Sequence, residues 1–117
     1  MQEPTFVILT ALLSGPLHGY AILSEVQQMS QGRVQMRVGT LYAALERLAR
    51  EGLVEVDREE IVSGRLRRYY RITGQGAEVL SQEAQRLARL AGQARRRLAQ
   101  RPIQARVLGV ECAGGGA

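Results

Sequence analysis

The sequence predicts a mostly α-helical domain that carries one small β-hairpin and ends in a long helix. Three observations lead to this prediction. Apolar residues recur at helical spacing through the first 50 residues, two alternating segments flank a Ser-Gly turn, and a further helical pattern fills much of the last third. A chain of 117 residues is the size of one domain, and its core must be mainly aliphatic because aromatic residues make up only 4%.

Two short helices are expected first. One begins at Glu3–Thr5, where a proline in the first turn costs no hydrogen bond, and stops at Ser14–Pro16. A turn at His18–Gly19 leads into the second, which spans Tyr20 to about Met29. Its buried stripe is predicted to contain Ile22, Leu23, Val26 and Met29. A single histidine at a helix start most simply caps that helix, so His18 is interpreted as structural.

The third helix has the clearest pattern. Its buried stripe follows the i, i+3, i+4, i+7 spacing and consists of Leu41, Ala44, Leu45 and Leu48. Thr40 is expected to cap the first turn, and Glu51–Gly52 to end the helix, because glycine adopts the left-handed conformation of a helix end. Tyr42, Arg47 and Arg50 face outward. Three short helices joined by tight turns indicate a helix-turn-helix whose third helix would lie in a DNA major groove.

A basic hairpin follows at once. Leu53–Glu60 and Arg65–Thr73 alternate like strands, and Ser63–Gly64 supplies the turn. Four arginines lie in Arg65–Arg71. Arginines on a solvated hairpin can simply discourage edge pairing. Their position directly after the third helix instead favours a wing that contacts DNA.

The last helix is expected to begin at Thr73–Gly76 and to run to about Gln100. Apolar residues recur along it at alternating steps of three and four, as in a heptad seam: Ala77, Leu80, Ala84, Leu87, Ala91, Ala94 and Leu98. The helix could fold back on its own domain, but about 35 Å of helix is too long for that body to cover. We therefore expect a homodimer. Leu90 lies off the seam and could pack, with Leu12, between the first helix of one subunit and the last helix of the other.

The charge favours a nucleic-acid partner. The net charge is +5, the pI is near 10.3, and all 16 basic residues are arginine. The planar guanidinium suits phosphates and guanine edges, although a GC-rich coding bias would equally account for the missing lysines.

Several classes are disfavoured by composition. The chain has no apolar run of about 18 residues, and no basic residue precedes its first apolar run, so neither a membrane span nor a signal peptide is expected and the protein is predicted to be cytoplasmic. One cysteine and one histidine provide no disulfide, metal site or nucleophile–base pair, so we expect no cofactor and no enzyme. Residues 102–117 are interpreted as a flexible tail in which Cys112 is incidental.

Three motifs together resemble the PadR family of bacterial transcriptional regulators: HGYAI, VGTLYAALERLAREGLV and RRYYRITGQG. The resemblance covers Pro4 to about Gln100. It implies a winged helix-turn-helix over residues 1–73, a single dimerisation helix over residues 74–101, and, for most members, repression of transcription.

The resemblance also implies roles for individual residues. Gly39, Thr40 and Tyr42 match the motif of the DNA-reading helix, in which Leu41 belongs to the core. Tyr70 and Ile72 match wing positions that pack inward. The basic wing tip corresponds to Arg65, Arg67 and Arg68.

Two departures from the family pattern matter. The family often has Ser-Pro before the Gly-Thr and Pro after the Tyr, where this chain has Arg37–Val38 and Ala43. Arg37 adds a side chain that could reach DNA. Some members bind flat aromatic drugs between their C-terminal helices with the help of tryptophan, which this chain lacks.

These observations predict a repressor that binds an inverted-repeat operator as a homodimer, with an inducer that the sequence does not name. The predicted DNA-binding residues are Arg33, Arg37, Gly39, Thr40, Tyr42, Arg47, Arg65, Arg67 and Arg68. The predicted dimerisation residues are Leu80, Ala84, Leu87, Leu90, Ala91, Ala94 and Leu98. The main alternative is a winged-helix module that binds acidic proteins rather than specific DNA. A ligand-sensing dimer without DNA binding is disfavoured by the intact GTLY stretch.

Overall fold

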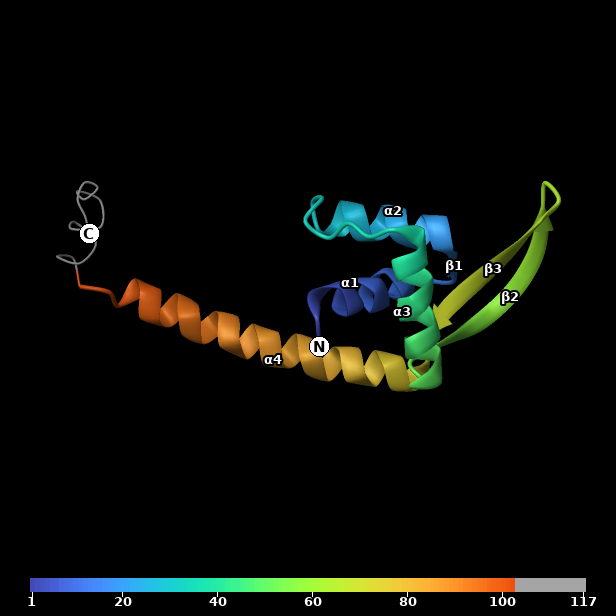
Figure 1. Ribbon diagram of the computed structural model, residues 1–117. Coiled ribbons are helices and arrows are strands. Elements are labelled where there is room, and N and C mark those ends of the chain that lie inside the picture. Colours follow the sequence, from blue (N-terminus) through green and yellow to red (C-terminus); the bar gives the residue numbers. More distant parts are fainter. Residues whose placement is uncertain (103–117) are drawn as a thin grey trace. The chain divides into compact units, whose positions relative to one another are not determined.

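The structure is a computed structural model that describes residues 1–102 (Figure 1). The elements are α1 (Glu3–Ala11), a short 3-10 helix (Leu12–Ser14), β1 (Leu17–His18), α2 (Gly19–Met29), α3 (Val38–Arg50), β2 (Val54–Val62), β3 (Arg65–Ile72) and α4 (Gly74–Ala99). Residues 1–83 form one compact unit, and the rest of α4, from Ala84, belongs to a second. From residue 103 on, the predicted tail, with Cys112, lies outside the described residues.

The core of the first unit is aliphatic, as the composition predicted. The largest fully buried side chains are Ile8, Leu9, Leu12, Ile22, Val26, Leu41, Leu45, Leu48 and Val54. The stripe predicted for α3 is therefore confirmed. Two helix predictions need correction: Met29 is 42% exposed at the end of α2, and Leu12 is only 1% exposed inside its own chain. A side chain already buried in this way has no surface to offer a partner subunit.

His18 caps α2. Its Nδ1 accepts a hydrogen bond from the backbone N–H of Ala21 at 3.4 Å, which confirms the structural role that the sequence predicted. The imidazole meets the Tyr69 ring edge-on at a centroid distance of 5.4 Å. Burial, and secondly the positive charge of Arg67, lower the pKa of His18. The neutral imidazole, which alone has a lone pair for the cap, is thus the form that this site favours.

The start of α3 differs from the prediction. Arg37 is the N-cap residue and makes no side-chain cap, and the Leu41 N–H already donates to the Arg37 carbonyl at 3.0 Å. Thr40 therefore lies inside the first turn and does not cap the helix. Val34 is buried and Met36 packs against the core, so the chain is anchored early enough for the helix to begin at Val38.

The end of α3 follows the prediction. Gly52 has φ = +79°, in the left-handed region, directly after the C-cap Glu51.

The sheet has three antiparallel strands in the order β1-β3-β2. The predicted hairpin of β2 and β3 is confirmed, and its turn residues Ser63 and Gly64 both have positive φ, as a tight two-residue turn requires. The third strand, β1, was not predicted. It is two residues long and pairs Leu17 with Tyr70 and His18 with Tyr69, too short to show any alternation in the sequence.

A β-bulge interrupts β2 between Val56 and Arg58, where Asp57 is the extra residue. Because side chains alternate along a strand, the bulge sets which residues share each face of the hairpin. On one face the cross-strand pairs are Val54–Ile72, Val56–Tyr70, Glu59–Arg68 and Ile61–Leu66. On the other face they are Glu55–Arg71, Arg58–Tyr69, Glu60–Arg67 and Val62–Arg65.

The first turn of α4 is fastened to the end of α3. The Thr73 hydroxyl donates to the Gly52 carbonyl at 2.6 Å and accepts from the Gly76 N–H at 2.9 Å. Any Cβ at Gly76 would collide with the Leu53 carbonyl oxygen. Leu80, one turn later, is 5% exposed within the core, so it departs from the predicted dimer seam.

Among residues 1–102, no helix is long and apolar enough to cross a bilayer.

We predict that Gly76→Ala destabilises the protein by about 1–3 kcal/mol, the usual cost of overpacking, because the obstructing atom is a backbone carbonyl that cannot rotate away. Urea unfolding followed by circular dichroism would measure this. Gly74→Ala is the matched control, since a Cβ at Gly74 meets nothing within 4 Å. Equal midpoints for the two variants would contradict the prediction.

We also predict a pH dependence of stability that originates at His18. The unfolded chain takes up a proton near the ordinary pKa of 6.5, whereas the folded pKa is lower. The contribution of His18 is therefore complete above pH 6.5 and is lost as the pH falls through the lowered folded pKa. Urea midpoints measured at successively lower pH should fall more for the wild type than for His18→Asn, which keeps a capping acceptor but does not titrate. If the urea midpoints of the two proteins fall equally as the pH is lowered, His18 is not the source of the pH dependence.

Candidate nucleic-acid interface

A groove separates α3 from the face of the hairpin that carries Tyr70. Its volume is about 590 Å³. The residues that line it are Gly39, Tyr42, Ala43, Leu45, Glu46 and Ala49 from α3, and Val56, Arg68 and Tyr70 from the strands. We call this the α3–wing groove. It brings the predicted reading helix and one predicted wing arginine to the same part of the surface.

Tyr42 is held in place at one end of this groove. Its ring lies 6.5 Å, centroid to centroid, from that of Tyr70, and a Cβ at Gly19 would collide with its hydroxyl and ring. Glycine at position 19 thus lets the Tyr42 ring lie against the start of α2, where a larger residue would displace it. Tyr42 nonetheless remains 40% exposed. The sequence placed Gly19 and Tyr42 in separate motifs and gave no sign that they meet.

The other predicted reading residues lie around the first turn of α3. Arg37, Gly39 and Thr40 are all exposed. Thr40 and Tyr42, two positions apart on a helix, point to opposite flanks of that turn. Arg33 lies in the preceding loop and is also exposed. Neither Arg33 nor Arg37 forms an ion pair within the described residues.

A second, smaller cleft of about 320 Å³ lies where the hairpin tip approaches the start of α2. The residues that line it are His18, Gly19, Tyr20, Tyr42, Val62, Ser63, Arg65, Leu66, Arg67 and Arg68. The wing-tip arginines thus come close to Tyr42. Sequence reasoning missed Tyr20, which is 69% exposed at this cleft; an exposed aromatic residue in the first turn of a helix is the signal that could have indicated it.

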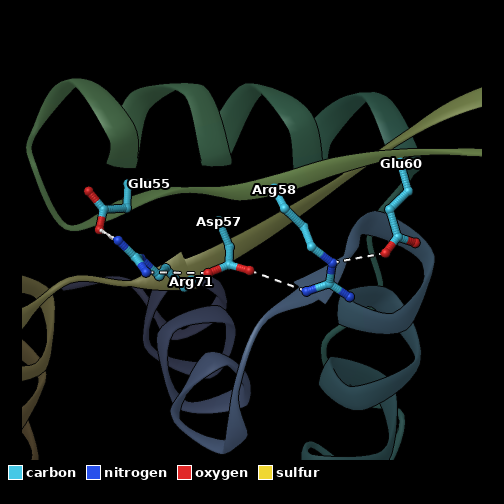
Figure 2. A network of polar contacts seen from close by, with 5 residues as sticks. All are labelled: Glu55, Asp57, Arg58, Glu60 and Arg71. Atoms are coloured by element: carbon cyan, nitrogen blue, oxygen red, sulfur yellow. Dashed lines mark hydrogen bonds and ion pairs between the residues drawn. The ribbon is translucent and has the colours of Figure 1, made fainter.

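Most of the hairpin's charge is internally neutralised. Figure 2 shows a chain of contacts on the face away from the groove, in which Arg71 pairs with Glu55 at 2.6 Å and Asp57 at 3.3 Å, and Arg58 pairs with Asp57 at 3.2 Å and Glu60 at 3.0 Å. Hydrogen bonds to these carboxylates raise the pKa of Arg58 and of Arg71, and the bond from Arg58 lowers the pKa of Glu60. Arg58 also covers the Tyr69 ring at 3.9 Å.

The face toward α3 contains one further pair. Arg68 Nε donates to Glu59 at 2.8 Å, and hydrogen bonding to Glu59, then to Tyr70, raises the pKa of Arg68. Arg65 and Arg67, at the tip, form no ion pair within the described residues. The predicted basic wing is therefore a nearly neutral stem with free positive charge at its tip.

Arg47 does not join this group. Its Nη2 donates to the Thr5 hydroxyl of α1 at 3.1 Å, and its Nη1 lies 3.6 Å from Glu51. These contacts direct the guanidinium along the flank of α3 that faces α1. The structure thus brings Tyr42, Gly39 and the wing arginines together and leaves Arg47 apart.

The chain is similar in sequence to known bacterial proteins. An uncharacterized 37.1 kDa protein in the transposon TN4556 of Streptomyces fradiae is 42% identical over 91 residues. The alignment covers 78% of this chain but 25% of that protein. This chain therefore spans about a quarter of the length of that relative.

Solved structures share the fold. A PadR family regulator from Clostridium difficile has a TM-score of 0.69 at 23% identity, over 83% of this chain and 99% of that one. PadR of Bacillus subtilis, solved in complex with operator DNA, has a TM-score of 0.63 at 24% identity, over 71% of this chain and 47% of that one.

The expected resemblance is borne out by a direct family match. Residues 8–82 match the family described as "Transcriptional regulator PadR-like family". This family and the solved neighbours are transcriptional regulators and not enzymes. Because the match extends over more than half of this chain, the chain belongs to the PadR-like family of transcriptional regulators.

Proposed function

We propose that this regulator is a repressor that binds an inverted-repeat operator as a homodimer, and that an inducer can release it. The observation that carries the proposal is the placement of exposed α3 residues beside a wing whose free arginines lie at its tip. The B. subtilis relative was solved on its operator, which supports the same partner here.

Base reading is assigned to the first turns of α3. Arg37, Thr40 and Tyr42 are exposed residues whose polar side chains can bond base edges in a major groove. Gly39 also supports the assignment of this part of α3 to the DNA interface. A Cβ there would meet nothing within 4 Å, and its φ is not positive, so neither packing nor backbone conformation requires glycine. Close approach of DNA would require it.

Phosphate contacts are assigned to Arg33, Arg65 and Arg67. None of these cations forms an ion pair within the described residues, although the charge of Arg67 adds to the hydrogen bond from Arg58 in lowering the pKa of Glu60 across the hairpin, so they can neutralise phosphates without first breaking an ion pair. Such contacts position the protein on the duplex and make its affinity depend on salt. Arg68 must first exchange Glu59 for a phosphate.

The dimer interface is assigned to the part of α4 that begins at Ala84. Its seam residues are exposed in the single chain: Ala84, Leu87, Ala91, Ala94 and Leu98. Leu87 and Leu98 are 40% and 58% exposed, and Leu90, beside the seam, is 50% exposed. Apolar side chains in one stripe of a helix are covered when a second helix packs along it, and the small alanines allow close approach. A twofold dimer would contact half-sites about 34–36 Å apart.

Repression follows if the operator overlaps a promoter, since the bound dimer would occlude it. An inducer would act by changing the separation of the two α3 helices. The sign of regulation rests on the resemblance to the family.

The test of this function is a gel shift with DNA from upstream of the protein's own gene, titrated with salt and with random competitor. A retarded band of dimer size that survives competitor supports the proposal. Gly39→Gln should abolish that band while leaving thermal stability unchanged, because the new side chain protrudes toward DNA and clashes with nothing in the protein. Gly74→Gln, at an equally open helical glycine, should bind as the wild type does.

Other outcomes would overturn the proposal. If random competitor DNA removes the band as effectively as the operator does, the protein has only a non-specific basic surface. Docking to an acidic protein would then explain the wing better. Normal operator affinity in Gly39→Gln would remove α3 from the interface.

A separate prediction concerns assembly. Leu87→Asp should yield monomers in light scattering, because a carboxylate would be buried in the centre of the seam. The fold of residues 1–83 should be unaffected, since Leu87 lies outside that unit. Gln93→Asp makes the same change of charge at an exposed position off the seam and should remain dimeric. A dimeric Leu87→Asp would refute this role of α4.

A further inference from the structure

The pair Glu59–Arg68 differs in its position from the other ion pairs that the described residues of the hairpin form. Through the bulge at Asp57, Glu59 follows Val56 onto the face that carries Tyr70, and it lies directly across from Arg68. The remaining carboxylates of β2 are on the opposite face or in the bulge, where they hold Arg58 and Arg71. One negative charge therefore lies on the same side of the wing as α3.

Arg68 lies at the boundary between the protein and the proposed DNA. It lines both the α3–wing groove and the wing-tip cleft. Its side chain is 46% exposed and that of Glu59 is 44% exposed, so solvent, or a phosphate, can reach both groups. An exposed pair of this kind is held weakly and can exchange partners.

We propose that Glu59 is a specificity-determining residue that competes with DNA phosphates for Arg68. This inference rests on the proposed function. A carboxylate and a phosphate offer a guanidinium the same planar, charge-assisted hydrogen bonds. A phosphate that approaches Arg68 must displace Glu59 and then tolerate its charge nearby.

The competition acts most strongly on random DNA. Non-specific binding is supplied essentially by phosphate contacts, and in such complexes the protein settles wherever those contacts are best. On an operator the base contacts of α3 fix the position of the wing, so Arg68 adds less. Glu59 thereby lowers affinity for random sequence more than affinity for the operator.

Glu59→Gln tests this inference directly. Affinities for an operator fragment and for a random duplex of equal length would be measured over a salt series. Random-duplex affinity should rise about threefold or more at low salt, and its salt dependence should steepen by about 0.9, the value for one further phosphate contact. Operator affinity should rise less, so the ratio of the two affinities should fall.

Glu55→Gln is the matched control. It changes the net charge equally but lies on the opposite face of the wing, and Arg71 keeps Asp57 as a partner. Its ratio of operator to random affinity should equal that of the wild type. Equal effects in Glu55→Gln and Glu59→Gln would show that only net charge matters and would overturn the inference.

The role of Arg68 is isolated by the double variant. In an Arg68→Gln background, Glu59→Gln should give no gain in random-duplex affinity, because the freed cation is missing. A gain of the same size there would mean that Glu59 repels DNA directly, and the inference would be wrong. A wild type that shows no preference for any operator would refute the proposed function itself, whereas a specific wild type with unchanged variants refutes only this inference.

Discussion

The contact between the Tyr42 ring and Gly19 is the constraint on which the candidate interface depends. It joins α3 to the start of α2, and the neighbouring Tyr70 joins the same ring to the wing. Three elements that are separate in the sequence are thereby fixed around one partly exposed side chain. Glycine at position 19 makes room for the Tyr42 ring, whereas Gly39 has open space around it. Two glycines in short motifs thus have different physical reasons, one inside the protein and one at its surface.

The net charge of the chain does not show where positive charge is available on its surface, because that depends on which arginines form ion pairs. All 16 basic residues are arginine, yet those of the wing stem are held by carboxylates of β2. A basic protein surface attracts any polyanion, and within the wing the stem carboxylates limit that attraction to the tip. Within residues 1–83, the arginines that form no ion pair are Arg33, Arg37, Arg65 and Arg67, which lie before the first turn of α3 and at the wing tip near Tyr42.

Most of the fold could be predicted because its signals are local. The stripe of α3, the turn at Ser63–Gly64 and the end of α3 at Gly52 each follow from neighbouring residues and are confirmed. The errors arise where tertiary contacts decide. Strand β1 forms only because β3 passes beside it. Thr40 does not cap α3 because the helix already begins at Val38. Leu80 is buried in the core of its own chain. In the site, the residue types were predictable, but which arginines are already paired was not, because pairing depends on the register of β2 with β3.

The bulge at Asp57 has a consequence for how such a wing can change in evolution. One additional residue reverses the alternation of the outer half of β2, while in its inner half Val54 lies in the core and Val56 follows on the same face. A deletion of Asp57 would remove the bulge but leave Arg58 opposite Tyr69 and Glu59 opposite Arg68, so every remaining residue of the strand would keep its present face. Loss of the single codon for Asp57 would therefore straighten the strand and remove the carboxylate that Arg58 and Arg71 share, while the other charges of the wing would stay on the faces that they now occupy.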